Sequence, residues 1–143
     1  MRSSVRIGRH FLYRHPGGIA RGMDARISAG IFGFAGVALG AFGAHGLRQS
    51  LDEAALSTYQ TAVFYHLVHA GVLLSLALQS SPRIAAVRWA ERSLGLGILL
   101  FCGSLYLLAV TGLRALGWLT PLGGLCFLAG WAALAASGFK TQP

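Results

Sequence analysis

Apolar residues fill four long stretches of this 143-residue chain, and polar residues gather in the short segments between them. Each stretch is about 20 residues long, which is the length of helix that crosses a hydrocarbon layer about 30 Å thick at about 1.5 Å rise per residue. Charged side chains are almost absent inside the stretches. The pattern predicts an all-α polytopic membrane protein, a bundle of four transmembrane helices, with spans at about 26–47, 59–79, 93–113 and 120–139.

The composition supports a lipid environment. Hydrophobic residues make up 55% of the chain and charged residues 11%, and the mean hydropathy is +0.60. A soluble chain with this balance would lack the polar residues needed to cover its surface. No hydrophilic region is long enough to build a core of its own, so we expect one transmembrane domain over residues 23–143.

The basic residues, which give the chain a net charge of +8, lie outside the spans. In a soluble protein this charge would suggest nucleic acid, whereas beside membrane helices it sets their orientation. Ten Lys and Arg residues fall in the N-terminal segment, the second loop and the C-terminus, and only Arg48 and Arg114 fall in the first and third loops. We therefore expect both termini in the cytoplasm and no nucleic-acid partner.

The first 22 residues are basic and contain no acidic side chain. Their apolar pieces are shorter than the run of about 7–15 residues that a secretory signal needs. We expect a disordered N-terminal extension here. The composition also fits a mitochondrial transit peptide, and Met23, directly before the first span, offers an alternative start of translation.

Local signals mark where helices begin between the spans. Ser50–Glu53 fits a capping box, so the second helix is expected to begin in the first loop with Ser50 as its N-cap. Ser81-Pro82 and Thr120-Pro121 are expected to cap the third and fourth helices. The link from Arg114 to Leu119 is so short that the third and fourth spans should be antiparallel neighbours.

Glycine and alanine are concentrated in the first span. Small residues let membrane helices approach closely, and close packing matters there because lipid tails are as apolar as leucine. We expect this helix to be the most tightly packed, with Gly36, Gly40 and Gly43 against other helices. The glycines fit either the crowded centre of their own bundle or the surface of a homodimer.

Polar side chains inside the spans carry whatever chemistry the chain has. Asp, Glu, Lys and Arg are missing from the deep positions, which argues against an ion-driven carrier. On the second span five residues share a helical face that should point into the bundle: Tyr59, Ala62, His66, His69 and Leu73. The candidate intramembrane polar face consists of His45, Tyr65, His66, His69, Ser104 and Tyr106.

Two of these residues, His66 and Tyr106, are expected at the same depth in the membrane. Counted inward from Tyr59 and from Leu113, His66 and Tyr106 each lie seven residues deep. At about 1.5 Å per residue this is about 10 Å. Both side chains can donate and accept, so we expect them to turn inward and to hydrogen-bond directly, through a water, or to backbone and His45.

The same residues do not predict a catalytic or a metal site. His66 and His69 could share a helical face, but a metal or haem site needs more ligands at that depth and partners that orient them. A hydrolase triad built on Ser104 lacks a carboxylate to orient its base. We expect no cofactor, and neutral histidines that bridge helices.

Four motifs, in order and with suitable spacing, resemble the YgdD-like family of small bacterial inner-membrane proteins. The resemblance runs from about Met23 to the C-terminus and implies a four-helix integral protein of the bacterial plasma membrane. The family is a domain of unknown function and brings no catalytic or binding residues. The motifs are Gly40-Ala-Phe-Gly-Ala-His-Gly-Leu47, Tyr59-x-Thr-Ala-Val-x-Tyr-His-x-x-His-Ala70, Gly97-Ile-Leu-Leu-Phe-x-Gly-Ser-Leu-Tyr-Leu-Leu-Ala-x-Thr-Gly112 and Thr120-Pro-x-Gly-Gly124.

These observations favour a small non-enzymatic structural or interaction protein. Its expected partners are the lipid bilayer and either further copies of itself or a larger membrane complex. The alternatives are a small-solute carrier or channel whose path the histidines and tyrosines line, and an intramembrane cofactor- or lipid-binding protein.

Overall fold

The structure, a computed structural model, describes residues 16–79 and 84–138, and four of its helices are long and apolar enough to cross a membrane. The fold class expected from the sequence is therefore confirmed. The third span is one continuous helix in which a π-helical turn, η2, joins α3 to α4. The elements are α1 (Pro16–Phe42), the π-helical turn η1 (Gly43–Leu47), α2 (Glu53–Leu78), α3 (Ala85–Gly97), η2 (Ile98–Cys102), α4 (Gly103–Thr111), the 3-10 turn η3 (Arg114–Trp118) and α5 (Leu119–Gly138).

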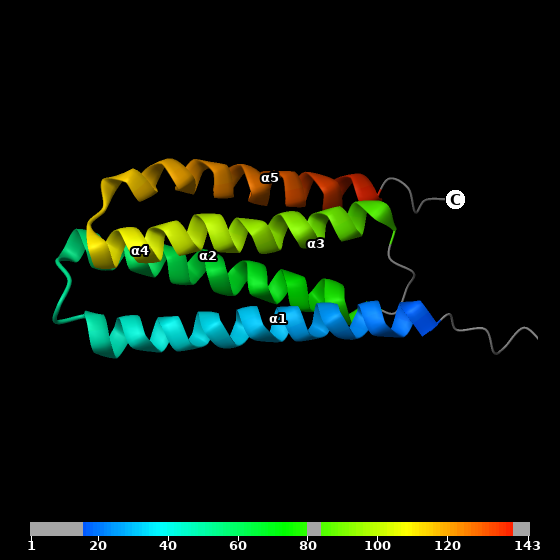
Figure 1. Ribbon diagram of the computed structural model, residues 1–143, viewed down its shortest axis with the longest axis horizontal. Coiled ribbons are helices and arrows are strands. Elements are labelled where there is room, and N and C mark those ends of the chain that lie inside the picture. Colours follow the sequence, from blue (N-terminus) through cyan, green and yellow to red (C-terminus); the bar gives the residue numbers. More distant parts are fainter. Residues whose placement is uncertain (1–15, 80–83, 139–143) are drawn as a thin grey trace, which may run out of the picture.

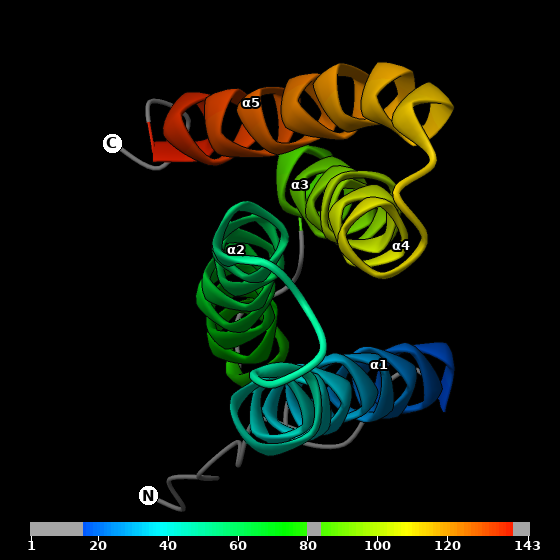
Figure 2. The same ribbon diagram turned by 90° about the vertical axis from the view of Figure 1, so that its left-hand side faces the viewer.

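The four spans form a staggered row. They lie side by side along the long axis (Figure 1), and the view along that axis places α2 between α1 and the α3–α4 helix, with α5 on the far side of α3 (Figure 2). Accordingly α1 packs against α2, and α5 packs against α3 and η2. The third and fourth spans are thus the neighbours that their short link predicted.

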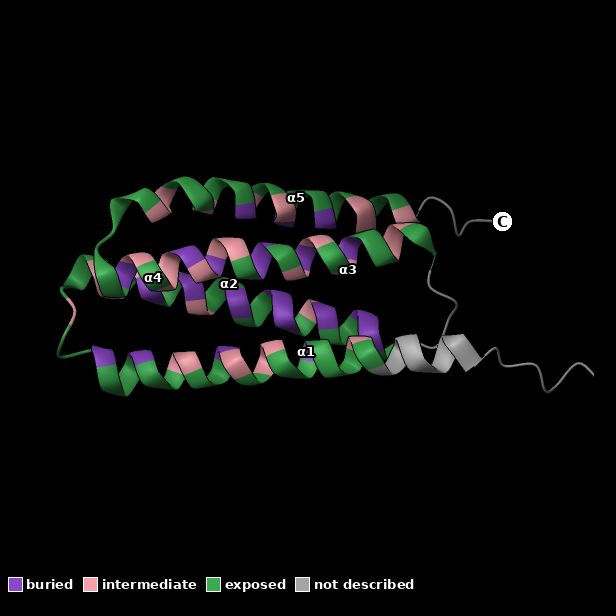
Figure 3. Ribbon diagram, in the orientation of Figure 1, coloured by how far each residue is buried: buried purple, intermediate pink, exposed green. Residues whose placement is uncertain are grey.

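The expectation that the first span is the most tightly packed helix is wrong. Only 17% of its apolar window is buried, as in the fourth span, against 39% for the second and third. The centre of the bundle is α2 together with α3–α4, whose facing sides hold most of the buried residues, while the outer surfaces are exposed (Figure 3). Small residues show where a backbone can approach another helix, but not how many helices surround it.

The predicted glycine contacts themselves are confirmed, because all three glycines face α2. A Cβ added at Gly36 would lie 2.8 Å from Leu67 Cδ2, one at Gly40 would lie 3.1 Å from Val63 Cγ1, and one at Gly43 would lie 2.5 Å from Tyr59 Cε1. Real Cβ atoms essentially never approach within 3.0 Å, so a side chain at Gly36 or Gly43 would displace its neighbour on α2, and one at Gly40 would press against Val63. At Gly30 and Gly33 an added Cβ would meet open space.

The helix starts differ in detail from those expected. Helix α2 does begin in the first loop, but its N-cap is Asp52, whose carboxylate accepts from the Ala55 N–H at 2.7 Å, and not Ser50. Aspartate caps as well as serine does, and it is placed directly before the first helical residue. Thr120 lies inside α5, which begins at Leu119, so it is not a cap either. The expected cap at residues 81–82 lies outside the described residues.

At its N-terminal end α1 begins at Pro16, which lies within the stretch that we expected to precede the domain. Proline suits the first turn of a helix because its missing N–H would have no partner there. The expectation for residues 1–15 falls outside the part of the chain that the structure describes. At the other end of the second loop α3 begins at Ala85, earlier than the expected span start, and presents Trp89 on its exposed side.

The tightest of the described glycine contacts lies at the π-helical turn η2. A Cβ added at Gly123 of α5 would collide with the backbone nitrogen of Phe101 in η2. A π-helical turn displaces backbone outward from the helix, and here the displaced backbone rests against a residue that has no side chain. Glycine at position 123 is therefore a condition of the contact between η2 and α5.

We predict that Gly123→Ala lowers the thermal stability of the protein in detergent. The added methyl group must push α5 away from η2, and overpacking of this kind costs about 1–3 kcal/mol. Gly124→Ala is the matched control, because a Cβ there would lie 3.9 Å from the Phe101 ring, which is ordinary contact. Equal melting temperatures for the two variants would contradict the packing described here.

We also predict that Gly40→Leu separates α1 from α2 and lowers the melting temperature in detergent, because the new side chain meets Val63 across the helix contact. Gly30→Leu adds the same side chain to the same helix where nothing lies within 4 Å of its Cβ. Its melting temperature should stay near that of the unmodified protein. A stable Gly40→Leu variant would show that the two helices do not depend on close approach at this point.

Candidate functional site

The polar side chains of α2 reach three different helices. Tyr59 donates its hydroxyl proton to the Leu39 carbonyl of α1 at 2.9 Å. His66 Nδ1 lies 3.3 Å from the Tyr106 hydroxyl of α4, and the Trp131 indole N–H of α5 donates to a ring nitrogen of His69, also at 3.3 Å. The buried face predicted for the second span is confirmed, and its hydrogen bonds connect α2 to every other span.

His69 uses both of its ring nitrogens. Its Nδ1 lies 2.7 Å from the Tyr65 carbonyl, which can only accept, so Nδ1 carries the proton. Nε2 is then the acceptor for the Trp131 indole, which can only donate. The ring also stacks on Phe127 with centroids 3.7 Å apart and planes inclined by 13°. His69 is therefore a neutral bridge between α2 and α5.

His66 is only 4% exposed and lies where α1, α2 and α4 meet. The hydrogen bond predicted between His66 and Tyr106 is present at its Nδ1 atom. Its Nε2 atom is buried and has no hydrogen-bond partner among the described residues. The imidazole fits there because Gly36 has no side chain: a Cβ at that position would lie 3.3 Å from the His66 ring.

Two tyrosine rings close the side of this cluster that faces the first loop. Tyr59 and Tyr106 have ring centroids 4.8 Å apart, and Tyr59 is 2% exposed. Phe32 meets the His66 ring edge-on at 6.2 Å from the side of α1. We call Phe32, Tyr59, His66 and Tyr106 the His66 cluster.

Ser104 connects α4 to α5. Its hydroxyl lies 2.9 Å from the Phe101 carbonyl and 2.8 Å from the Thr120 hydroxyl, and it is almost fully buried. This contact explains why Thr120 does not cap its helix. Neither of these partners is a base, so among the described residues the hydrogen bonds of Ser104 do not assemble a nucleophile.

The six residues of the predicted polar face do not gather at one place. His66 and Tyr106 belong to the His66 cluster, whereas His69 and Tyr65 lie on the side of α2 that faces α5. Tyr65 is 38% exposed and its ring contacts Phe101 at 4.8 Å. His45 is exposed in η1 and has no hydrogen bond or ring contact with the other described residues of this set.

Sequence reasoning missed Trp131 and Thr120 as partners. A tryptophan inside an apolar span carries an N–H that lipid cannot satisfy, and that signal could have identified Trp131 as a helix-bridging residue. Within the described residues no three His, Cys, Asp or Glu side chains are placed to hold a metal ion. His66 and His69 in particular turn to different helices, so they cannot share a ligand.

Comparison with known proteins identifies relatives of this chain. The family model described as "Protein of unknown function (DUF423)" matches residues 39–124. The UPF0382 membrane protein of Staphylococcus haemolyticus is 45% identical over 73% of this chain and 85% of its own length. The chain belongs to this family.

Other members are similarly close. A UPF0382 membrane protein of Haemophilus influenzae is 44% identical over 77% of this chain and 89% of its own length. The UPF0382 inner membrane protein YgdD of Escherichia coli is 42% identical over 81% of this chain and 89% of its own length. No solved structure matches the chain significantly. The four apolar helices and these relatives establish a small integral membrane protein.

The family match includes most of the hydrogen-bonding residues described above. Residues 39–124 contain Tyr59, His66, His69, Ser104 and Tyr106 together with Thr120. Trp131 lies beyond the matched region. The bonds of α2 to α1 and α4 therefore fall within the part of the chain that defines the family, and the bond of His69 to Trp131 does not.

We predict that His69→Leu lowers stability modestly, by about 0.5–2 kcal/mol, because hydrogen bonds between membrane helices average about 0.6 kcal/mol and ring stacking adds to this. The Trp131 fluorescence spectrum should shift in the same variant, since its indole loses its acceptor. His45→Leu is the control and should change neither property, because His45 is exposed. An unshifted spectrum in His69→Leu would contradict the bridge.

Proposed function

We propose that this chain is a non-enzymatic structural or interaction protein of the bacterial plasma membrane, with both termini in the cytoplasm. The observation that carries the proposal is the use made of its intramembrane polar groups. The Tyr59 hydroxyl, Nε2 of His69 and the Ser104 hydroxyl are engaged in contacts that hold helices together, and Nδ1 of His69 is bonded to the Tyr65 carbonyl of its own helix. Groups bound in this way stabilise the bundle and are not free to react.

The arrangement supports this function over a small-solute carrier. A transport path needs polar groups that follow one another across the membrane. Here His66 turns toward α1 and α4 and His69 turns toward α5, so α2 itself stands between them. Two hollows among the described residues are both lined from the first-loop half of the bundle, and neither lining extends to the end that carries the second loop.

Charge placement supports the proposed orientation. Arg26, Arg88 and Arg92 lie at the end of the bundle that carries the second loop, and Arg48 and Arg114 lie at the opposite end. Arg26 Nε also donates to the Ala77 carbonyl near the C-terminus of α2 at 3.4 Å. A cation is favourable at that helix end because of the helix dipole.

Helix α1 supports an interaction role. Among the described spans its backbone lies close only to that of α2, so its outer face is open. Phe34 on that face is 78% exposed and Val37 is 64% exposed. We propose that another copy of the chain or a component of a larger membrane complex covers this face.

Reporter fusions test the orientation. We predict that alkaline phosphatase inserted after Gln49 in the first loop is active, since it lies in the periplasm, and that green fluorescent protein at the C-terminus is fluorescent, since it lies in the cytoplasm. The reciprocal fusions serve as controls and should both be silent. An active phosphatase at the C-terminus would contradict the charge argument.

Cysteine cross-linking in native membranes tests the interaction role. We predict that Val37→Cys, in a Cys126→Ala background, forms a cross-linked species that contains either a second copy or another protein. Leu125→Cys on α5 is the matched control, because it is similarly exposed at 61% and lies outside α1. Failure of Val37→Cys to cross-link above the Leu125→Cys level would contradict the proposed interface. An absorption spectrum of the purified protein with a Soret band would favour a cofactor protein instead.

A further inference from the structure

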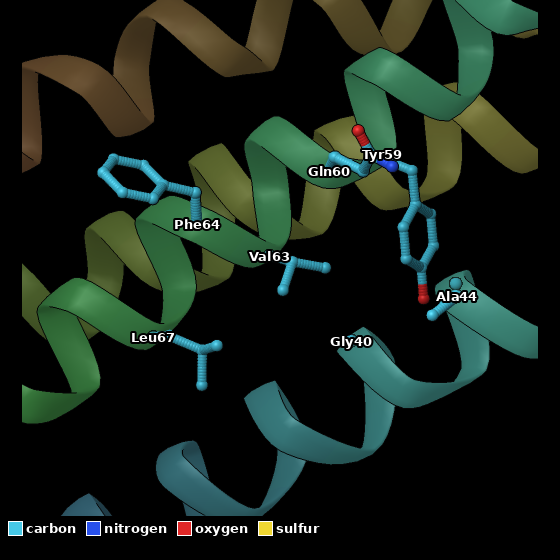
Figure 4. A pocket seen from close by; sticks show the side chains of 8 residues that line it. Gly40, Ala44, Tyr59, Gln60, Val63, Phe64 and Leu67 are labelled. Atoms are coloured by element: carbon cyan, nitrogen blue, oxygen red, sulfur yellow. The ribbon is translucent and has the colours of Figure 1, made fainter.

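A groove of about 330 Å³ runs between α1 and α2 near the first-loop end and opens to the outside of the bundle (Figure 4). It exists because Gly40 and Gly43 contribute no side chains to its floor and Ala44 contributes only a methyl group. On the α2 side Val63 points toward α1, while Phe64 points away from it and is 65% exposed. The groove therefore lies on the lipid-facing surface.

The walls of the groove are almost entirely hydrocarbon. The Tyr59 hydroxyl, which lies at one end, is already bonded to the Leu39 carbonyl. Water does not fill an apolar hollow of this kind, since it would find no polar partners there. The lining therefore favours a slender apolar occupant.

One side chain at the rim departs from this pattern. Gln60 is exposed and its amide has no hydrogen-bond partner among the described residues. Exposed hydroxyls on the same helix behave differently: Thr58, Thr61 and Ser75 each donate to the carbonyl four residues earlier. An amide that faces lipid without a partner is costly.

The depth of Gln60 identifies what can satisfy its amide. Helix α2 has 26 residues and begins at Glu53, seven residues before Gln60. It is about 39 Å long and extends beyond an apolar layer of about 30 Å by about 4–5 Å at each end. The backbone of Gln60 then lies about 6 Å below the layer boundary, and its flexible side chain can reach the lipid ester groups by snorkelling.

We propose that a phospholipid of the leaflet on the first-loop side binds in this groove, with one acyl chain between α1 and α2 and an ester carbonyl that accepts a hydrogen bond from the Gln60 amide. A second copy fits less well. A helix is about 10 Å across, too wide to enter between two packed helices, and its backbone carbonyls are already paired within the helix. Ester carbonyls are free acceptors at this depth. This site does not depend on the proposed function.

Native mass spectrometry of the full chain in detergent, titrated with dioleoylphosphatidylethanolamine, tests the site. The unmodified protein should retain one lipid in preference to further ones. Ala44→Leu fills the groove and should abolish this retention. Gln60→Leu keeps the groove apolar and removes only the amide, so retention should weaken about threefold, as expected for one hydrogen bond in a membrane.

Two controls match these variants. Ala41→Leu adds the same side chain to the exposed side of α1 outside the groove. Thr61→Val changes the residue next to Gln60, and the Thr61 hydroxyl that it removes bonds to the Ser57 carbonyl of the same helix. The Ala41→Leu and Thr61→Val variants should each retain lipid as the unmodified protein does. An ether-linked phospholipid, which has no ester carbonyl, should bind the unmodified protein about threefold more weakly and should bind Gln60→Leu no differently from the ester lipid.

Several outcomes would contradict the proposed phospholipid site. Equal lipid retention by Ala44→Leu, Gln60→Leu and the controls would do so, provided that circular dichroism shows the variants folded. Retention that responds to Ala44→Leu but ignores both Gln60→Leu and the ether lipid would remove the amide from the proposal. A dimer that Ala44→Leu converts to lipid-free monomer would assign the groove to a second copy of the chain.

Discussion

The structure depends on hydrogen bonds that leave α2 in three directions. In a bilayer the apolar surfaces of helices gain little by meeting each other, because lipid solvates them equally well. What distinguishes one arrangement from another is close packing and the pairing of groups that lipid cannot satisfy. Tyr59, His66 and His69 supply such groups to α1, α4 and α5 in turn. Each bond is weak alone, but together they specify α2 as the central helix and fix which side of it each neighbour occupies.

Much of this fold follows from the sequence. The four spans follow from hydropathy, the contact of the third and fourth spans follows from the short link between them, and the inward face of α2 follows from the spacing of its histidines. The central position of α2 does not follow. Six glycines in the first span indicated a crowded helix, yet a glycine facing one partner and a glycine facing lipid look alike in a sequence. Gly40 meets Val63, and Gly30 meets nothing within 4 Å.

A polar contact between two helices could be predicted where equal depth in the membrane is enough to bring the two side chains together. His66 and Tyr106 lie at equal depth on antiparallel helices and do meet. His45 was expected near them and is not, because α1 meets α2 through Gly36, Gly40, Gly43 and Leu47, and a residue two positions from both Gly43 and Leu47 faces the opposite side of the helix. The bond from Trp131 to His69 needs the lateral order of the helices, which residue spacing within a single span does not contain.

The two sides of α1 have different surroundings. Its inner side is bound to α2 by three glycine contacts and by the bonds from Tyr59 to the Leu39 carbonyl and from Arg26 to the Ala77 carbonyl. Phe32 also reaches across to α3, where it lies 3.7 Å from the position of a Cβ at Gly95. Its outer side has no protein contact within the described residues. A helix attached along one side leaves room beside its contact line, and the groove beside Gly40 and Gly43 is that room. The glycines that bring α1 close to α2 therefore also create the hollow that lipid can occupy, so close packing and lipid binding arise from the same residues.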